Sequence, residues 1–175
     1  MIVIADTGPL LALARIKALG LLKSLYQQVV TSPTVYTEAV TAGLAMGAED
    51  AALLQEAYQS GLLTVRTPAL AVLPHSEFLH GGEEESIRLA IELKADWLLI
   101  DDLDARQTAQ KNFSAAGIST EIKGTLGVIV SAAQASNISS EQAIEMIQTL
   151  KNRPDVWIAS SLCDAVIETL KGVQA

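Results

Sequence analysis

The stretch Met1-Ile2-Val3-Ile4-Ala5-Asp6-Thr7-Gly8-Pro9-Leu10 decides the fold, because a short apolar strand runs directly into a turn and a helix. Asp6 ends the apolar run, and Pro9 suits the first helical position. A similar strand end occurs later, where Asp101 and Asp102 follow the apolar run Trp97-Leu98-Leu99-Ile100. These two units predict parallel strands joined by helices.

Strands alternate with helices along the rest of the chain. We expect strands at 2–5, 29–31, 62–65, 97–100 and 117–120, and helices at 10–16, 21–26, 33–41, 48–60, 83–94, 105–116, 125–134, 140–150 and 160–170. The glycines of residues 43–47 predict a break between two helices. This pattern is typical of an α/β fold with three layers, α/β/α, around a central parallel sheet. The chain contains no repeat or linker, which predicts one domain over residues 1–175.

Carboxylates mark the predicted strand ends. Asp6, Asp101 and Asp102 follow strands, and Glu83 opens the helix that leads into the second strand. The carboxyl ends of parallel strands lie on one edge of the sheet, where ligands bind. Acids gathered there repel one another unless a positive group lies between them, so the pattern indicates a divalent-metal site.

Helical periodicity separates three neighbouring glutamates. Glu83 shares a face with Ile87 and other apolar residues, whereas Glu84 can pair with Arg88 at i+4 and Glu85 lies on the polar side. Acids also favour a helix N-terminus through its dipole, which suffices for Glu84 and Glu85. The position of Glu83 on the apolar face of its helix is not explained by the dipole and favours a functional interpretation.

Glu38 is a further candidate, because it lies between the apolar residues Val35 at i−3 and Ala42 at i+4. It is therefore expected on or beside the buried face of its helix. Capping is the competing explanation for Asp6, Asp101 and Asp102. Successive strand residues alternate faces, so only one of the last two can enter a pocket unless the strand has already turned.

Composition limits the classes of function. Half of the chain is hydrophobic and its net charge is −8, which argues against nucleic-acid binding through bulk electrostatics. A few local cations could still contact nucleic acid, and Arg15, Lys17, Arg106 and Lys111 follow the acidic strand ends. The absence of a basic leader and the single cysteine favour the cytoplasm, and no apolar run is long enough to span a membrane.

Four segments in order resemble the PIN domain family. They are Val3 to Leu10, Pro33 to Val40, Gly82 to Ile87 and Leu98 to Asp102. The stretch Lys123-Gly124-Thr125-Leu126-Gly127-Val128 resembles a turn in a prokaryotic PIN subgroup related to VapC-type toxin nucleases.

The resemblance implies a PIN-like fold and a Mg²⁺- or Mn²⁺-dependent ribonuclease. It assigns Asp6, Glu38, Glu83 and one or both of Asp101 and Asp102 to the metal site, with Thr7 as a neighbouring hydroxyl. It also implies an RNA substrate and an antitoxin partner. The apolar residues of 21–26 suit either a homodimer contact or the core.

Several alternatives stay open. Glu84 replaces a small residue of the subgroup's Gly-Glu-x-Glu pattern, so Glu83 and Glu85 compete for the metal, and Asp104 competes with Asp101 and Asp102. One rival class is a PIN module without nuclease activity. The other is a phosphoryl-transfer protein with Asp6 or Asp101 as phosphoryl acceptor. Such a protein requires a lysine or threonine at the end of a further strand, and Lys123 is the candidate for it. His75 and His80 lack the spacing of a zinc pair, which predicts solvated loop residues.

Overall fold

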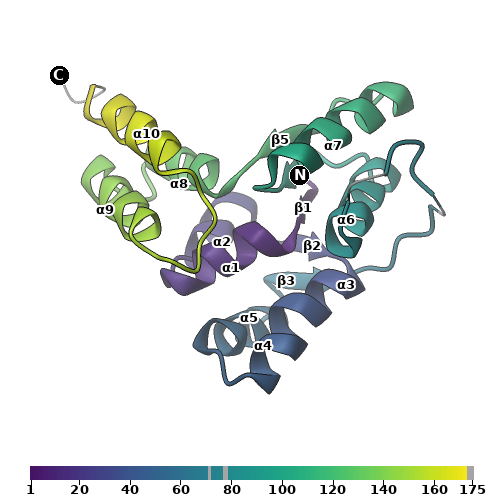
Figure 1. The fold of residues 1–175 in the computed structure, drawn as a ribbon, viewed down its shortest axis with the longest axis horizontal. Helices are drawn as coiled ribbons and strands as arrows, with labels where there is room; N and C mark the ends of the chain where they lie inside the picture. The colour runs from purple at the N-terminus through teal and green to yellow at the C-terminus, as the bar shows by residue number, and fades with distance from the viewer. Residues whose placement is uncertain (71, 77–78, 173–175) are drawn as a thin grey trace.

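The computed structural model describes residues 1–70, 72–76 and 79–172. Within these residues, five parallel strands form one sheet in the order β3-β2-β1-β4-β5. Their bounds are β1 Val3–Ala5, β2 Val29–Thr31, β3 Leu63–Val65, β4 Trp97–Leu99 and β5 Glu121–Lys123. The predicted three-layer α/β/α fold with a central parallel sheet is confirmed, and β3 lies at an edge (Figure 1).

Alternating side chains of the strands supply two cores. Val3, Ala5 and Leu99 pack into one core, whereas Ile4 and Leu98 pack into the other. The first core is covered by α1 Thr7–Arg15, α2 Gly20–Tyr26, α5 Glu49–Gln59 and α8 Thr125–Gln134, and the second by α6 Gly81–Glu92 and α7 Leu103–Ala116. The two helical layers lie on opposite faces of the sheet because strand residues alternate between faces.

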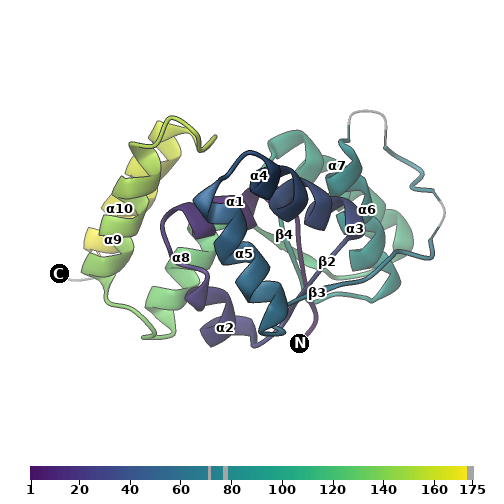
Figure 2. The same cartoon turned by 90° about the horizontal axis from the view of Figure 1, so that it is seen from below.

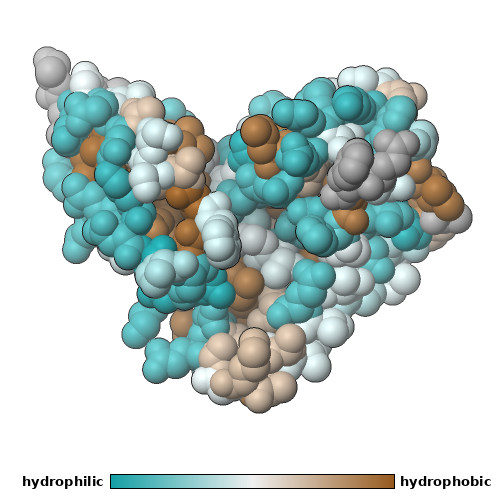
Figure 3. Space-filling view, in the orientation of Figure 1, coloured by the Kyte–Doolittle hydropathy of each residue, from teal (hydrophilic) through white to brown (hydrophobic). Residues whose placement is uncertain are grey.

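Two later helices form an arm beside the sheet. Helices α9 Ser140–Lys151 and α10 Ser160–Gly172 contact each other and α8. Figure 1 shows the arm diverging from α7, and the view in Figure 2 shows α9 and α10 side by side. The space-filling view shows a notch between the arm and the body that contains α7 (Figure 3).

The strand order changes direction at β1, because β2 and β3 are added on one side of it and β4 and β5 on the other. β2 pairs with one side of β1 and β4 with the other, and Ala5 of β1 lies opposite Leu99 of β4. The Asp6 amide donates to the Leu99 carbonyl at 2.9 Å. Such a switch point leaves a crevice at the carboxyl ends of the strands. The acidic ends of β1 and β4 therefore border the crevice.

The predicted strand at 117–120 is wrong, because the fifth strand begins at Glu121. Gly117 ends α7 with a φ of +65°, a conformation that glycine adopts without strain. The Ile118 amide then donates to the Phe113 carbonyl, and the Thr120 hydroxyl donates to the Ala95 carbonyl. These residues complete the helix end and position the strand that follows.

The helix predicted at 33–41 continues beyond its expected end. It comprises α3 Pro33–Tyr36, the π-helical segment η1 Thr37–Thr41 and α4 Ala42–Ala45. Gly43 lies inside α4 and does not break the helix. A Cβ at this position would lie 2.6 Å from the Ala51 Cβ. Glycine permits close packing against α5 here, and the predicted break is confined to residues 46–48.

The apolar side chains of α2 belong to the core. Leu21, Leu22 and Tyr26 are buried, and α2 packs against α8. The core alternative therefore accounts for this segment, and the predicted homodimer gains no support from it. None of the helices described is long and apolar enough to cross a membrane.

Candidate active site

A cavity of about 370 Å³ lies where β1 and β4 end. We call it the acid pocket; its described lining residues are Asp6, Thr7, Gly8, Glu38, His80, Glu83, Asp101, Asp102 and Trp157. All five acids predicted for the site meet here. Asp104 and Glu85 are absent from these described lining residues, and a Glu85 oxygen instead accepts from the Thr34 amide at 3.1 Å.

Asp6 has the most unusual environment of the five acids. It caps α1, with Oδ2 accepting from the Gly8 amide at 3.4 Å, while Oδ1 is buried without a hydrogen-bond partner. The residue is 7% exposed, and burial raises the pKa of Asp6 from 3.8 to about 7. Bonds from Thr7 and Gly8 oppose this rise, whereas the charges of Glu83 and Glu38 add to it. Capping therefore explains one oxygen of Asp6 but not the other.

Glu38 reaches the acid pocket from the π-helical segment η1. Its Oε2 accepts a 2.5 Å hydrogen bond from the Thr7 hydroxyl. The predicted buried face was wrong in one respect, because Ala42 is exposed and Gly43 is buried instead. A π-turn adds one residue to a helical turn and so shifts the faces that follow. Glu38 is itself exposed by overall area, although its carboxylate lines the pocket.

Glu83 lies on the buried side of α6, as the helical pattern predicts. It is 9% exposed, and its Oε2 accepts from the His80 amide at 2.9 Å. Burial raises the pKa of Glu83, and the charges of Asp102 and Glu38 raise it further, while the His80 backbone bond lowers it. The first turn of α6 therefore holds a carboxyl group that binds a proton more readily than an exposed glutamate.

Both Asp101 and Asp102 line the acid pocket, because β4 has ended at Leu99 and the chain has turned. Asp101 accepts from the Thr125 amide at 2.7 Å and from the Thr125 hydroxyl at 2.5 Å. Burial raises the pKa of Asp101, whereas the Thr125 bonds and the Arg106 charge lower it. Asp102 caps α7 through a 2.8 Å bond from the Ala105 amide.

Helix N-termini stabilise this collection of negative charge. Asp6 and Asp102 cap α1 and α7, Glu83 bonds to the residue preceding α6, and Asp101 bonds to the first residue of α8. The positive end of a helix dipole and its free amides favour carboxylates. The protein can therefore gather these acids without a lysine or arginine among the described lining residues of the pocket.

The donor chemistry fits a hard divalent cation, because the acids offer only oxygen. A Cβ on Gly82 would lie 2.8 Å from Glu38 Oε2 and 3.3 Å from Asp6 Oδ1, so both oxygens face one small space that glycine leaves open. Within the described residues, no group of three or more His, Cys, Asp or Glu side chains is placed to hold a metal ion as it stands. Coordination of one ion by three of these carboxylates would require another of them to rotate towards Asp6 and Glu38, whereas Mg²⁺ is commonly held by one or two carboxylates and waters.

The sequence did not single out two pocket residues. His80, expected to be a solvated loop residue, lines the acid pocket and precedes α6; its place before Gly81 and Gly82 was the available signal. Trp157 lies between α9 and α10, and no sequence pattern linked it to the strand ends. Of the candidate cations, Arg15 pairs with Asp50 at 2.8 Å, and Arg106 donates to the Ile100 carbonyl at 2.8 Å.

The arrangement of strands and acids defines an α/β protein with a carboxylate site at a sheet switch point. A family model described as a PIN domain matches residues 2–172, and the chain belongs to this family. PIN domains are generally nucleases and typically use divalent metals. No curated protein and no solved structure matches the chain.

Proposed function

We propose that this protein is a Mg²⁺- or Mn²⁺-dependent endoribonuclease and that the acid pocket is its active site. The observation that carries the proposal is the buried Asp6 Oδ1, which has no partner and faces the same space as Glu38 Oε2. An unpaired buried oxygen costs free energy unless a donor or cation completes its environment. A divalent cation would do so at a site where substrates have access.

A bound divalent ion would lower the pKa of a coordinated water and neutralise charge on the scissile phosphate. Asp6 and Glu38, whose oxygens face the same space, would hold this ion together with Asp101 or Asp102. Glu83 would hold a second ion or orient the attacking water. The Thr7 hydroxyl fixes the orientation of the Glu38 carboxylate. Burial raises the pKa of Glu83, which makes this carboxylate a better proton acceptor than an exposed glutamate.

The family is of the nuclease type, and the resemblance to VapC-type toxin nucleases makes RNA the proposed substrate. Single-stranded or exposed RNA could bring its backbone to the carboxylates. We place the activity in the cytoplasm. The resemblance to VapC-type toxins extends the proposal to a toxin that an antitoxin protein neutralises. In a bacterial host, the wild type should slow growth and Asp6→Asn should not, and equal growth would argue against a toxin.

One observation favours an inactive PIN module as the second candidate. Both oxygens of Asp101 bond to Thr125, which is the arrangement expected of a purely structural residue. A phosphoryl-transfer protein is less favoured, because the Lys123 ammonium donates to the Ser131 hydroxyl at 2.8 Å and lies 3.6 Å from the centre of the Trp97 ring. These contacts leave the proposed lysine engaged away from Asp6.

Cleavage of a mixed RNA pool tests the proposal. Wild type, Asp6→Asn and the matched control Asp104→Asn are each incubated with Mn²⁺ and with chelator. Asp104 is an exposed acid outside the described lining of the acid pocket. Metal-dependent cutting by wild type and Asp104→Asn, but not by Asp6→Asn, is the expected result. Equal cutting by Asp6→Asn would exclude the site, and metal binding without cutting would favour the inactive module.

A further inference from the structure

Trp157 is a large apolar side chain at the surface. Trp157 is 94% exposed, whereas tryptophan residues are highly buried on average. It lines the acid pocket and also an adjoining cavity of about 560 Å³, which we call the apolar groove. An indole that borders a carboxylate site without covering it is available to a ligand of that site.

The chain on either side of Trp157 fixes its outward direction. Val156 and Ile158 are partly buried and pack against the first core, so the intervening Trp157 faces outward. The exposure of this indole is therefore imposed by two anchored neighbours rather than by a loose segment. Replacing the indole should leave those core contacts in place.

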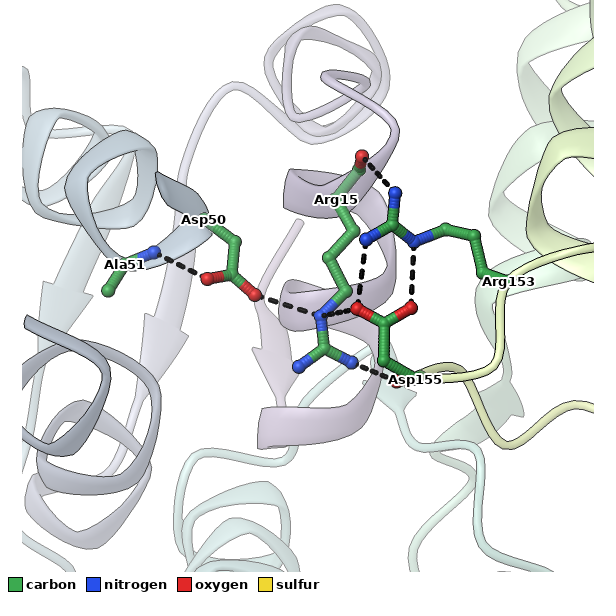
Figure 4. Close-up of polar contacts among 5 residues, drawn as sticks. All are labelled: Arg15, Asp50, Ala51, Arg153 and Asp155. Atoms are coloured by element: carbon green, nitrogen blue, oxygen red, sulfur yellow. Dashed lines mark hydrogen bonds and ion pairs between the residues drawn. The ribbon is translucent and has the colours of Figure 1, made fainter. Parts of the chain in front are cut away.

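An ion-pair network holds the same segment against the body of the protein (Figure 4). Arg15 Nε lies 2.8 Å from Asp50 Oδ2 and 3.4 Å from Asp155 Oδ2. Arg153 donates two bonds to the Asp155 carboxylate, at 2.9 and 2.8 Å. Arg15 thereby links α1, α5 and the segment before α10, two residues from Trp157. The network positions the indole at the border of the acid pocket.

The apolar groove extends the surface that Trp157 offers. Its described lining residues come from α7, α8, α10 and the chain beside them, and include Leu103, Leu126, Ile158, Leu162 and Val166. Two of them are well exposed, Leu103 at 65% and Leu162 at 51%. Figure 3 shows hydrophobic surface on the inner side of the arm, facing the notch. A flat apolar group would meet the indole beside the groove.

The charge of the acid pocket decides which flat group suits this surface. Five carboxylates line the acid pocket, its described lining includes no lysine or arginine, and the whole chain carries −8. The apolar groove adds Arg106 and Lys123, but Asp101 and Asp102 line it as well and balance their charge. A polyanion therefore gains little from Coulomb attraction to the protein itself. Stacking of a base on an aromatic ring does not depend on charge and contributes about 1–3 kcal/mol per base. Base stacking would therefore contribute a larger share of the binding affinity here than at a positively charged nucleic-acid interface.

We infer that Trp157 is a stacking platform that holds a nucleobase of a single-stranded substrate beside the acid pocket. The inference rests on the proposed function, because it assigns a substrate contact to that site. Stacking accepts every base, so Trp157 provides affinity and register without sequence specificity. Carboxylates that act on a phosphate and an indole that holds a neighbouring base would together select unpaired strands.

Tryptophan fluorescence tests the platform without relying on cleavage. The full chain is titrated, with Mg²⁺ present, with a ten-residue 2′-O-methyl oligonucleotide and with a matched oligonucleotide of abasic residues. Wild type should show quenching with the first and not with the second. Trp157→Phe should lose the quenching, since Trp97 lies beneath Lys123 and remains as the internal reference.

Affinity measured by anisotropy of a labelled oligonucleotide supplies the second readout. Trp157→Ala should weaken binding by about 5- to 150-fold, which corresponds to the range for one stacked base. Trp157→Phe should stay within a few-fold of wild type because a phenyl ring still stacks. Equal affinity for Trp157→Ala, or equal binding of the abasic strand, would overturn the inference. A dimer that only Trp157→Ala dissociates would overturn it in favour of a second copy.

The two proposals fail in different ways. Quenching at Trp157 without cleavage of any RNA would remove the nuclease and keep the platform. Cleavage that depends on Asp6, with an unchanged KM in Trp157→Ala, would remove the platform and keep the nuclease. Thermal unfolding of both Trp157 variants should match wild type, because the side chain is exposed.

Discussion

Replacing Asp6 by asparagine should stabilise the metal-free protein, and the gain should depend on pH. Burial raises the pKa of Asp6 from 3.8 to about 7. Between these two values the folded state keeps a proton that the unfolded state releases, so stability falls as pH rises through this window. Asparagine is neutral at every pH and lacks this dependence.

The structure gives the size of the effect. Each pH unit between the two pKa values corresponds to about 1.4 kcal/mol, so keeping Asp6 ionised in the fold costs about 4 kcal/mol at pH 8. For a chain of this length, that free energy corresponds to roughly 8–16 °C in Tm. The residue is 7% exposed, so little solvent screening reduces the figure. At pH 4 the two proteins should have nearly equal stability.

Thermal unfolding in chelator at pH 4, 5, 6, 7 and 8 measures this difference. Burial also raises the pKa values of Glu83 and Asp101. Subtracting wild type from Asp6→Asn removes the contribution of Asp101 and leaves, besides the effect of Asp6 itself, only its charge coupling to Glu83. Asp104→Asn, which replaces an exposed acid, should follow wild type. A Tm difference between Asp6→Asn and wild type that is the same at pH 5 and pH 8, or a less stable variant at pH 8, would refute the reasoning.

Three further predictions concern the acid pocket. Mn²⁺ at about 100 times its Kd should stabilise wild type by about 2.7 kcal/mol and Asp6→Asn by less, and an unchanged Tm at millimolar metal would count against a metal site. Gly82→Ala should lower metal affinity and cleavage at least about tenfold, since its Cβ would lie 2.8 Å from Glu38 Oε2; Gly81→Ala, whose Cβ would meet one methyl group at 3.4 Å, should retain both. Thr7→Val should reduce kcat about tenfold with little change in Tm, and Thr7→Ser should restore it; a normal kcat in the valine variant would exclude a role for the hydroxyl bond to Glu38.

The sequence predicted the parts of the fold that depend on apolar runs. Ile2 to Ala5 and Trp97 to Ile100 are strongly apolar and end at acids, so their order along the chain sufficed to place Asp6 and Asp101 at one sheet edge. Glu83 was recognised because one helical face carries both it and buried apolar residues. In these cases local patterning and tertiary burial agree.

The errors occur where tertiary contacts decide the local structure. β5 contains one apolar residue, Ile122, between Glu121 and Lys123, and as an edge strand it needs no apolar run. The π-turn around Glu38 has no signal in helical periodicity, which assumes a constant turn. Trp157 reaches the site because Arg15 and Asp155 join segments far apart in the sequence.

Capping alone does not explain why residue 6 is an aspartate. Asparagine caps a helix about as well as aspartate and carries no charge. In this fold asparagine would still accept the Gly8 bond, and it would avoid the cost of burying an ionised Oδ1 that has no partner. Both carboxylate oxygens of the buried Asp101 accept hydrogen bonds from Thr125, whereas Asp6 Oδ1 accepts none among the described residues. The Asp6 charge destabilises the metal-free fold, and Oδ1 faces a small space beside Glu38 that a side chain larger than glycine at residue 82 would fill. A cation bound in this space would supply the missing interaction and stabilise the fold. The stability gained by Asp6→Asn and the activity lost by it are therefore expected to have the same cause.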